Sequence, residues 1–281
     1  MELEILGSGT SHGIPVIGCA CPVCSSSDAR DARTRASALL RGDNGETVLI
    51  DAGPEFRIQA LRARIKRIDA LLITHSHADH VHGIDDLRIF THERDLPVYA
   101  NASTLQELRE RFAYVFKTTQ EGGGKPHIEL READPHSDGT TLETSRAISI
   151  GSIKVEPIPA LHGTLPVLGW RCGDTAYLTD CNEIPESSFA RLQGVKNLVI
   201  DALRERRHST HYSFDGALAV IERIAPSRAW FTHICHDFSH LGIERWIAEH
   251  APDWSGLKAT GKKIEPAHDG LRIPVRQEPN G

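Results

Sequence analysis

Short apolar stretches with the composition of β-strands recur along the chain, and segments with helical spacing lie between them. Strands that alternate with helices are typical of an α/β protein. Turn residues at Asn44-Gly45 and at Gly173-Asp174 each separate two neighbouring strands and predict β-hairpins. The predicted strands are residues 3–6, 36–40, 47–51, 68–73, 153–158, 168–171, 176–179, 197–200 and 228–232. The predicted helices are residues 54–65, 84–90, 103–112, 185–192, 213–224 and 241–250.

Side chains that can bind a metal ion follow four of the predicted strands. Ligands usually bind in the crevice at the carboxyl ends of the strands in an open α/β sheet. The recurrence therefore predicts that four separate loops converge on one metal-binding pocket. The side chains are His75 and its neighbours after residues 68–73, His162 after 153–158, Asp180 after 176–179, and His233 after 228–232.

The stretch Thr74-His75-Ser76-His77-Ala78-Asp79-His80-Val81-His82 is the densest of these ligand clusters. His75 and His77 are two positions apart, so in an extended backbone both face the same side and can hold one ion. Asp79 and His80 follow where the chain is expected to turn into a helix, so they can reach a second ion. Four ligands shared between two ions close neither site, and a catalytic metal needs an open position.

Three cysteines lie close together near the start of the chain, at Cys19, Cys21 and Cys24. Thiolates at this spacing in a reducing compartment usually hold a metal, and the C-x-C-x2-C pattern lacks one ligand for a closed tetrahedral zinc site. Three free thiols on a loop are the alternative. The sequence therefore predicts a structural zinc knuckle whose fourth ligand comes from elsewhere.

Three other segments bear on the candidate site. The glycine-rich residues 7–13 form a loop that could approach a ligand closely, although the signal for a phosphate contact is weak. Asp51 ends a predicted strand and either supports a metal ligand or caps a turn. Residues 117–145 are polar and predict an irregular insertion, which is either a lid over the site or a disordered loop.

The length of 281 residues fits a single α/β domain over 1–281 that includes this insertion. The net charge of -6 argues against a nucleic-acid surface spread over the protein. The start of the sequence has no basic segment followed by an apolar one, and no apolar run approaches ~18 residues. We therefore expect a cytoplasmic protein with no membrane contact, whose cysteines are thiols or metal ligands.

The ligand pattern resembles the metallo-β-lactamase superfamily, over residues 3–240. The resemblance rests on the H-x-H-x-D-H motif at residues 75–80, followed in order by His162, Asp180 and His233. It implies a four-layer αββα sandwich and a site for two divalent ions, zinc or manganese. His75, His77 and His162 would hold one ion and Asp79, His80 and His233 the other, with Asp180 bridging. Two such ions share a hydroxide and suit hydrolysis of phosphodiesters, in which Asp79 would also act.

Within the superfamily, the three cysteines resemble the structural zinc knuckle of the PhnP-type cyclic phosphodiesterases. That family completes the knuckle with a histidine three residues beyond the last metal-binding histidine, which here is His236. It opens 5-phosphoribosyl 1,2-cyclic phosphate, so a small cyclic phosphate ester is the substrate that the resemblance implies. The family also places a histidine 22 residues before the last metal ligand, here His211, to stabilise charge or protonate the leaving group.

Residues around His211 bear on that role. Asp201 ends the strand before it and is expected to hold the imidazole in its cationic form. His208 competes with His211 for the catalytic role. Arg206 and Arg207 either contact phosphate or are a solvated basic pair, and we favour the second reading.

Three other functions remain open. A transfer-RNA 3' processing endonuclease shares the metal set but usually carries a basic RNA-binding arm, which this acidic chain does not supply. A thioester or lactam hydrolase has a different signature around the third histidine from Leu161-His162-Gly163-Thr164-Leu165-Pro166. A non-catalytic cofactor carrier on the same fold usually lacks ligands that are all present here. A homodimer is compatible with each of these functions.

Overall fold

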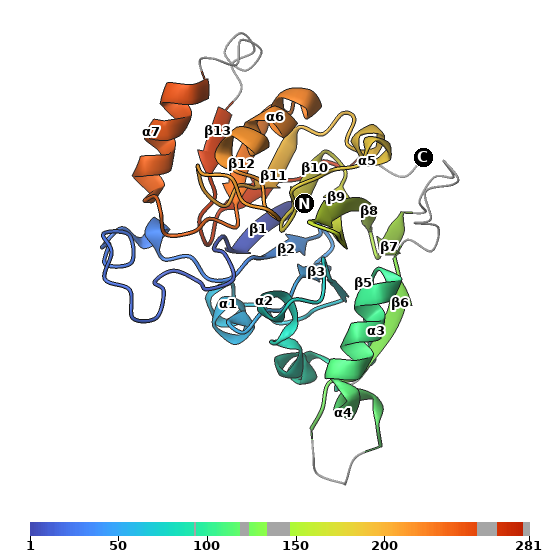
Figure 1. Ribbon diagram of the computed structural model, residues 1–281. Coiled ribbons are helices and arrows are strands. Elements are labelled where there is room, and N and C mark those ends of the chain that lie inside the picture. Colours follow the sequence, from blue (N-terminus) through green and yellow to red (C-terminus); the bar gives the residue numbers. More distant parts are fainter. Residues whose placement is uncertain (93, 119–123, 134–146, 252–262, 278–281) are drawn as a thin grey trace.

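Two seven-stranded sheets lie against each other in the computed structural model, which describes residues 1–92, 94–118, 124–133, 147–251 and 263–277 (Figure 1). The first sheet has the order β14-β1-β2-β3-β4-β5-β6, and the second has the order β13-β12-β11-β10-β9-β8-β7. The strands of the first sheet are β1 (Glu2–Gly7), β2 (Ser37–Arg41), β3 (Thr47–Ile50), β4 (Ala70–Leu72), β5 (Leu96–Ala100), β6 (Ile128–Glu132) and β14 (Arg272–Pro274). The strands of the second are β7 (Ile148–Ile150), β8 (Ile153–His162), β9 (Leu165–Cys172), β10 (Thr175–Leu178), β11 (Asn197–Asp201), β12 (Arg228–Thr232) and β13 (Lys263–Pro266).

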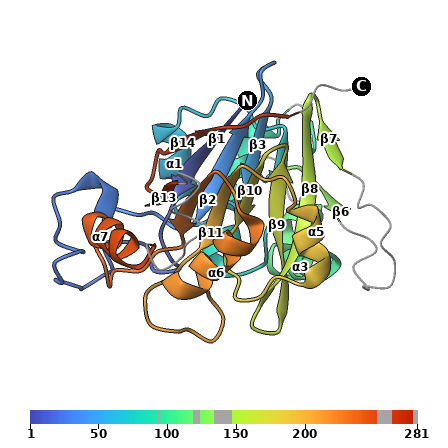
Figure 2. The same cartoon turned by 90° about the horizontal axis from the view of Figure 1, so that it is seen from above.

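Helices cover the outer face of each sheet, as the two views show (Figures 1 and 2). The first sheet is covered from the N-terminal half of the chain and the second from the C-terminal half. The α-helices are α1 (Phe56–Arg62), α2 (Ala78–Val81), α3 (Ala102–Arg111), α4 (Ala113–Phe116), α5 (Glu186–Arg191), α6 (Phe214–Ile224) and α7 (His240–His250). Two 3-10 helices are η1 (Ala29–Asp31) and η2 (Ile84–Phe90).

The alternation of side chains along each strand builds the layers. In β1, Leu3 and Ile5 pack against Trp170 and Trp230 of the second sheet, whereas Leu6 packs with the helices outside the first sheet. Such alternation is expected because successive side chains of a strand point to opposite faces. The result is one core between the sheets and one beneath each helical layer, which confirms the predicted αββα sandwich.

Parallel strands bring the candidate ligands to one edge of the sheets. In the first sheet β3, β4 and β5 run parallel, and in the second sheet β10, β11 and β12 do so. The predicted hairpins are β2–β3 and β9–β10, both antiparallel. The loops after β4, β10, β11 and β12 therefore leave the sheets at their carboxyl ends, where the candidate site forms.

Three parts of the sequence reading need correction. The predicted insertion at 117–145 is wrong at residues 128–132, where β6 pairs with β5 at the edge of the sheet. Residues 119–123 and 134–145 lie outside the described residues. Four further strands are absent from the predicted set, namely β5, β7, β13 and β14. The helix predicted at 84–90 is a 3-10 helix, η2. Among the described helices, none has the length and apolar character needed to cross a membrane.

Candidate metal centre

The loop after β4 brings His75 and His77 together with His162 from the end of β8. One ligand atom from each of the three side chains lies within 4.8 Å of the other two. The rings of His75 and His77 are 4.5 Å apart, and those of His77 and His162 are 5.2 Å apart, centroid to centroid. His75 is fully buried whereas His77 is exposed, so this group opens toward solvent.

A second group lies next to the first and contains Asp79, His80, Asp180 and His233, all buried. Asp180 Oδ1 is 3.2 Å from His80 Nε2, and its Oδ2 is 3.2 Å from His233 Nε2. Asp180 Oδ2 is also 3.9 Å from His75 Nε2 of the first group. Asp180 therefore lies between the two groups, as the predicted bridging role requires.

Several buried atoms of this centre make no hydrogen bond within the described residues. They are Nε2 of His75 and of His80, both ring nitrogens of His233, and Oδ2 of Asp79. A buried polar atom without a partner costs roughly 1–3 kcal/mol. Imidazole nitrogens and carboxylate oxygens are ligands that zinc and manganese accept, so the donor set fits two divalent ions.

The charges of the centre favour ionised carboxylates. Burial alone would raise the pKa of Asp180, but the neighbouring rings of His233 and His80 hold that pKa well below its usual range. Burial lowers the pKa of His75, so its imidazole is neutral, the form that binds metal. The centre therefore combines anionic carboxylates with at least one neutral imidazole.

Asp51, at the end of β3, supports the second group from beneath. Its carboxylate accepts hydrogen bonds from Thr74 N and from Thr74 Oγ1, each at 2.8 Å, and contacts His80 Nδ1 at 2.7 Å. A metal-binding histidine usually donates its other ring N–H to such a carboxylate, which fixes the tautomer and the orientation of the ring. Of the two roles left open for Asp51, this contact favours support of a ligand.

His211 and Asp201 lie beside both groups. His211 Nδ1 is 2.7 Å from Asp201 Oδ2, and its ring centroid is 4.5 Å from that of His162 and 4.6 Å from that of His233. Burial lowers the pKa of His211, although the carboxylates of Asp180 and Asp79 oppose that shift, so the imidazole favours its neutral form rather than the expected cationic one. The competing His208 is exposed, with its ring 5.1 Å from that of His211, so it lies farther out.

The three cysteines near the start of the chain surround His236, as expected. The Sγ atoms of Cys19, Cys21 and Cys24 are 3.4, 3.5 and 3.4 Å from His236 Nδ1. The backbone N–H of Cys24 lowers the pKa of Cys21 to about 6, whereas burial raises the pKa of Cys24 to about 11. Thiolate is the metal-binding form, so Cys21 is ready to bind zinc at neutral pH.

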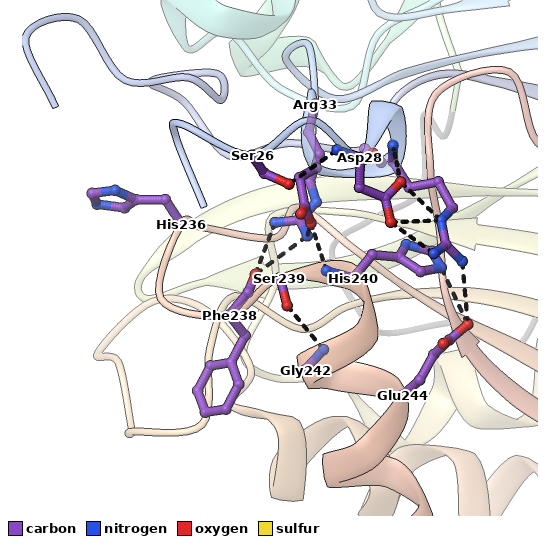
Figure 3. A network of polar contacts seen from close by, with 12 residues as sticks. Ser26, Asp28, Arg33, His236, Phe238, Ser239, His240, Gly242 and Glu244 are labelled. Carbon is purple, nitrogen blue, oxygen red and sulfur yellow. Dashed lines mark hydrogen bonds and ion pairs between the residues drawn. The ribbon is translucent and has the colours of Figure 1, made fainter. Parts of the chain in front are cut away.

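A fully buried arginine connects the cysteine loop to the loop after β12. Arg33 donates to the carbonyl oxygen of Cys235 at 3.0 Å, to that of Phe238 at 3.3 Å, and to Asp31 at 3.1 Å (Figure 3). These bonds fix the backbone on both sides of His236. The same loop begins with His233, so the candidate zinc knuckle and the candidate active site share one rigid connection.

Sequence reasoning missed several residues of the centre. Gly53 lies so close to the loop that an added Cβ would be 2.0 Å from the carbonyl oxygen of Asp79. The carbonyl oxygen of Thr210 lies 2.6 Å from His162 Nδ1. Asp51, Asp180 and His233 have positive φ angles of 59°, 51° and 58°, which non-glycine residues rarely adopt. Gly53 itself is the one signal in the sequence, since a glycine often allows close approach of two backbone segments.

The fold and the donor set are typical of metal-binding proteins of the beta-lactamase superfamily. The family described as the beta-lactamase superfamily domain matches residues 46–234, and the chain belongs to this family. Among solved structures, the chain is similar to one described as a new diphosphatase from the PhnP family. The two are 39% identical with a TM-score of 0.81, over 97% of this chain and 96% of the other.

Two relatives have other names. An octanoyltransferase of Porphyromonas gingivalis (strain ATCC BAA-308 / W83) is 39% identical over 279 residues, which is 99% of this chain and 52% of that protein. The chain therefore spans about half the length of this relative. The coenzyme PQQ synthesis protein B of Cupriavidus necator is 26% identical over 314 residues, covering 98% of this chain and 99% of that protein.

Proposed function

We propose that this protein is a dinuclear metal-dependent phosphodiesterase that hydrolyses small phosphate esters. The observation that carries the proposal is the position of Asp180, whose carboxylate oxygens lie within 3.2–3.9 Å of histidines from both ligand groups. Two divalent ions held there would activate a water molecule and neutralise the charge of a phosphoryl group. The similarity to a PhnP-family diphosphatase supports phosphoryl chemistry.

The residues around the two ions would have different roles in the reaction. Asp79, His80 and Asp180 are anchored in the buried half of the centre, and Asp51 orients His80. His77 and His162 line the more open half, where a substrate can enter. Asp201 accepts a hydrogen bond from His211 Nδ1, so His211 Nε2 is the atom that can exchange a proton with the leaving group.

The substrate class is small and anionic. We propose 5-phosphoribosyl 1,2-cyclic phosphate as the first substrate to test, because the cysteine and histidine pattern resembles the PhnP type. A small diphosphate is the second, because the similar solved structure is described as a diphosphatase. In this proposal Cys19, Cys21, Cys24 and His236 hold a structural zinc ion.

A carrier role in cofactor biosynthesis is the second candidate function. It is favoured by the full-length similarity to coenzyme PQQ synthesis protein B. Such a protein would keep the fold and bind metal without turning over phosphodiesters. The transfer-RNA nuclease remains the less favoured alternative, because the net charge of -6 gives little attraction to RNA.

The test is hydrolysis of bis-p-nitrophenyl phosphate by purified protein supplied with Mn²⁺ or Zn²⁺. We expect turnover that depends on the metal and is lost in Asp180→Ala, with Asp95→Ala as an exposed control. Metal binding without turnover of this ester, of the cyclic phosphate or of a diphosphate would favour the carrier. Cleavage of precursor transfer RNA without hydrolysis of the small esters would favour the nuclease.

A further inference from the structure

The loop that carries His75, His77 and His80 is held from two sides. Asp51 holds it on the side of the second ligand group, through Thr74 and His80. On the other side α3 reaches the loop at Ser76, the residue between His75 and His77. Asp51 thus supports His80 of the second group and, through Thr74, His75 of the first, whereas the support from α3 reaches the first group alone.

Residues of α3 form hydrogen bonds with both the side chain and the backbone of Ser76. Ser76 Oγ donates to Glu107 Oε2 at 2.7 Å, and Arg111 Nη1 donates to the carbonyl oxygen of Ser76 at 2.5 Å. Arg111 Nη2 also donates to the same Glu107 oxygen at 2.7 Å, across one turn of the helix. Ser76 is 3% exposed, so its polar atoms are bound by α3 rather than by water.

The position of His77 depends on these hydrogen bonds to Ser76 more than the positions of the neighbouring histidines do. The ring of His75 contacts Thr74 Oγ1 at 3.1 Å, that of His80 contacts Asp51 at 2.7 Å, and that of His162 contacts Thr210 O at 2.6 Å. Within the described part of the chain, no hydrogen bond reaches the ring of His77, which is also exposed. Apart from contacts with the rings of His75 and His162, its orientation depends on the backbone that precedes it, and that backbone is fixed at Ser76.

We propose that Glu107 and Arg111 of α3 are positioning residues that hold His77 in place for a metal ion. The inference rests on the proposed function, because it assumes that His77 is a ligand. It assigns α3 to the ion held by His75, His77 and His162. Asp51 supports ligands of both groups, because it contacts His80 and holds Thr74, whose Oγ1 contacts His75 Nδ1.

The expected size of the effect follows from other metal sites. Replacing a residue that orients a metal ligand typically lowers metal affinity or activity by 10–100-fold. Glu107 and Arg111 are 38% and 39% exposed, so their ion pair alone contributes little to folding. If the contacts of Glu107 and Arg111 with Ser76 only stabilised the fold, replacing either residue would change the affinity for metal very little.

The experiment measures the affinity of metal-free protein for Zn²⁺ by competition with a chelator of known affinity, and counts bound ions by native mass spectrometry. The variants are Arg111→Met and Glu107→Gln, with Arg109→Met as the control on the same helix. Arg109 carries the same charge and is exposed, and no hydrogen bond is found for it among the described residues. We expect one active-site ion to bind about 10–100-fold more weakly in the two variants and within twofold of wild type in the control.

A double-mutant cycle identifies the ion. Once His77→Ala has removed the ligand, Arg111→Met should change the affinity for the remaining active-site ion by less than twofold. Arg111→Lys, which keeps one donor for the Ser76 carbonyl, should recover part of the loss. Unchanged affinity for both ions in Arg111→Met, or an equal loss with and without His77, would overturn the proposal. Failure of the wild-type protein to bind two ions would instead refute the proposed function.

Discussion

The pair of His211 and Asp201 gives the sharpest prediction about the chemical step. Asp201 Oδ2 is fully buried and accepts hydrogen bonds from Cys181 N at 2.9 Å and from His211 Nδ1 at 2.7 Å. Asp201→Asn keeps the volume and can keep one oxygen facing both donors, but it removes the negative charge of the carboxylate. Without that charge, a His211 that carries protons on both nitrogens is less stable.

The two expected losses differ in size. A positioned general acid contributes about 10²–10⁴ in rate, which corresponds to about 3–5 kcal/mol of transition-state stabilisation. A hydrogen bond to a charged group contributes about 1.5–3 kcal/mol to stability, and Asn retains part of it. The loss in rate should therefore exceed the loss in stability, and a fall in folded fraction should not account for it.

The assay compares two substrates on the same variant. An alkoxide leaving group, as in a cyclic ribose phosphate, needs a proton, whereas p-nitrophenolate leaves without one at neutral pH. We expect Asp201→Asn to lower kcat on the alkoxide ester by about 10²–10⁴-fold and to affect bis-p-nitrophenyl phosphate much less. Equal losses on both substrates, with metal content unchanged, would refute the assignment of a proton to His211.

Four further predictions follow from the same geometry. Asp180→Ala should abolish turnover, because it removes the carboxylate between the two ligand groups; retained activity would remove the bridging assignment. Cys21→Ser should lower the melting temperature more than kcat, and elemental analysis should find one zinc fewer per chain. Unchanged zinc content would count against the knuckle. Thr74→Val should cost about 1–3 kcal/mol in urea unfolding, since Thr74 Oγ1 donates to the buried Asp51; an unchanged midpoint would contradict this. Chelation of all metal should lower the melting temperature, which added Zn²⁺ should restore; equal melting of both forms would exclude bound metal.

The sequence predicts the strands that end in candidate ligands, because each of them is a short apolar run that stops at a turn, but it misses β5 inside the first sheet. Residues 68–73 and 228–232 are such runs, and the side chains that follow them meet in space. The resemblance to the metallo-β-lactamase superfamily, rather than the chain pattern alone, implied the grouping of His75 with His162 and of His80 with His233, and these side chains lie together in the structure. It could not show their separations, which depend on packing of one sheet against the other.

Edge strands and long-range supports were not predictable in this way. The strand β6 pairs on one side only and has just Ile128 and Leu130 as apolar residues, so its pattern is weak. The hydrogen bonds of Glu107 and Arg111 with Ser76 join residues that are 31 and 35 positions apart in the sequence. On a helix surface such charged residues have the sequence pattern of solvated side chains, and only the fold shows that they face the loop.

The most direct test of the central claim is a titration of metal-free protein with Mn²⁺ while hydrolysis of bis-p-nitrophenyl phosphate is followed. If both ligand groups bind an ion and Asp180 lies between the ions, the rate should rise until two active-site equivalents have bound. Asp180→Ala should stay inactive at every ratio. Full activity at one equivalent, or activity in Asp180→Ala equal to that of wild type, would contradict a two-ion centre.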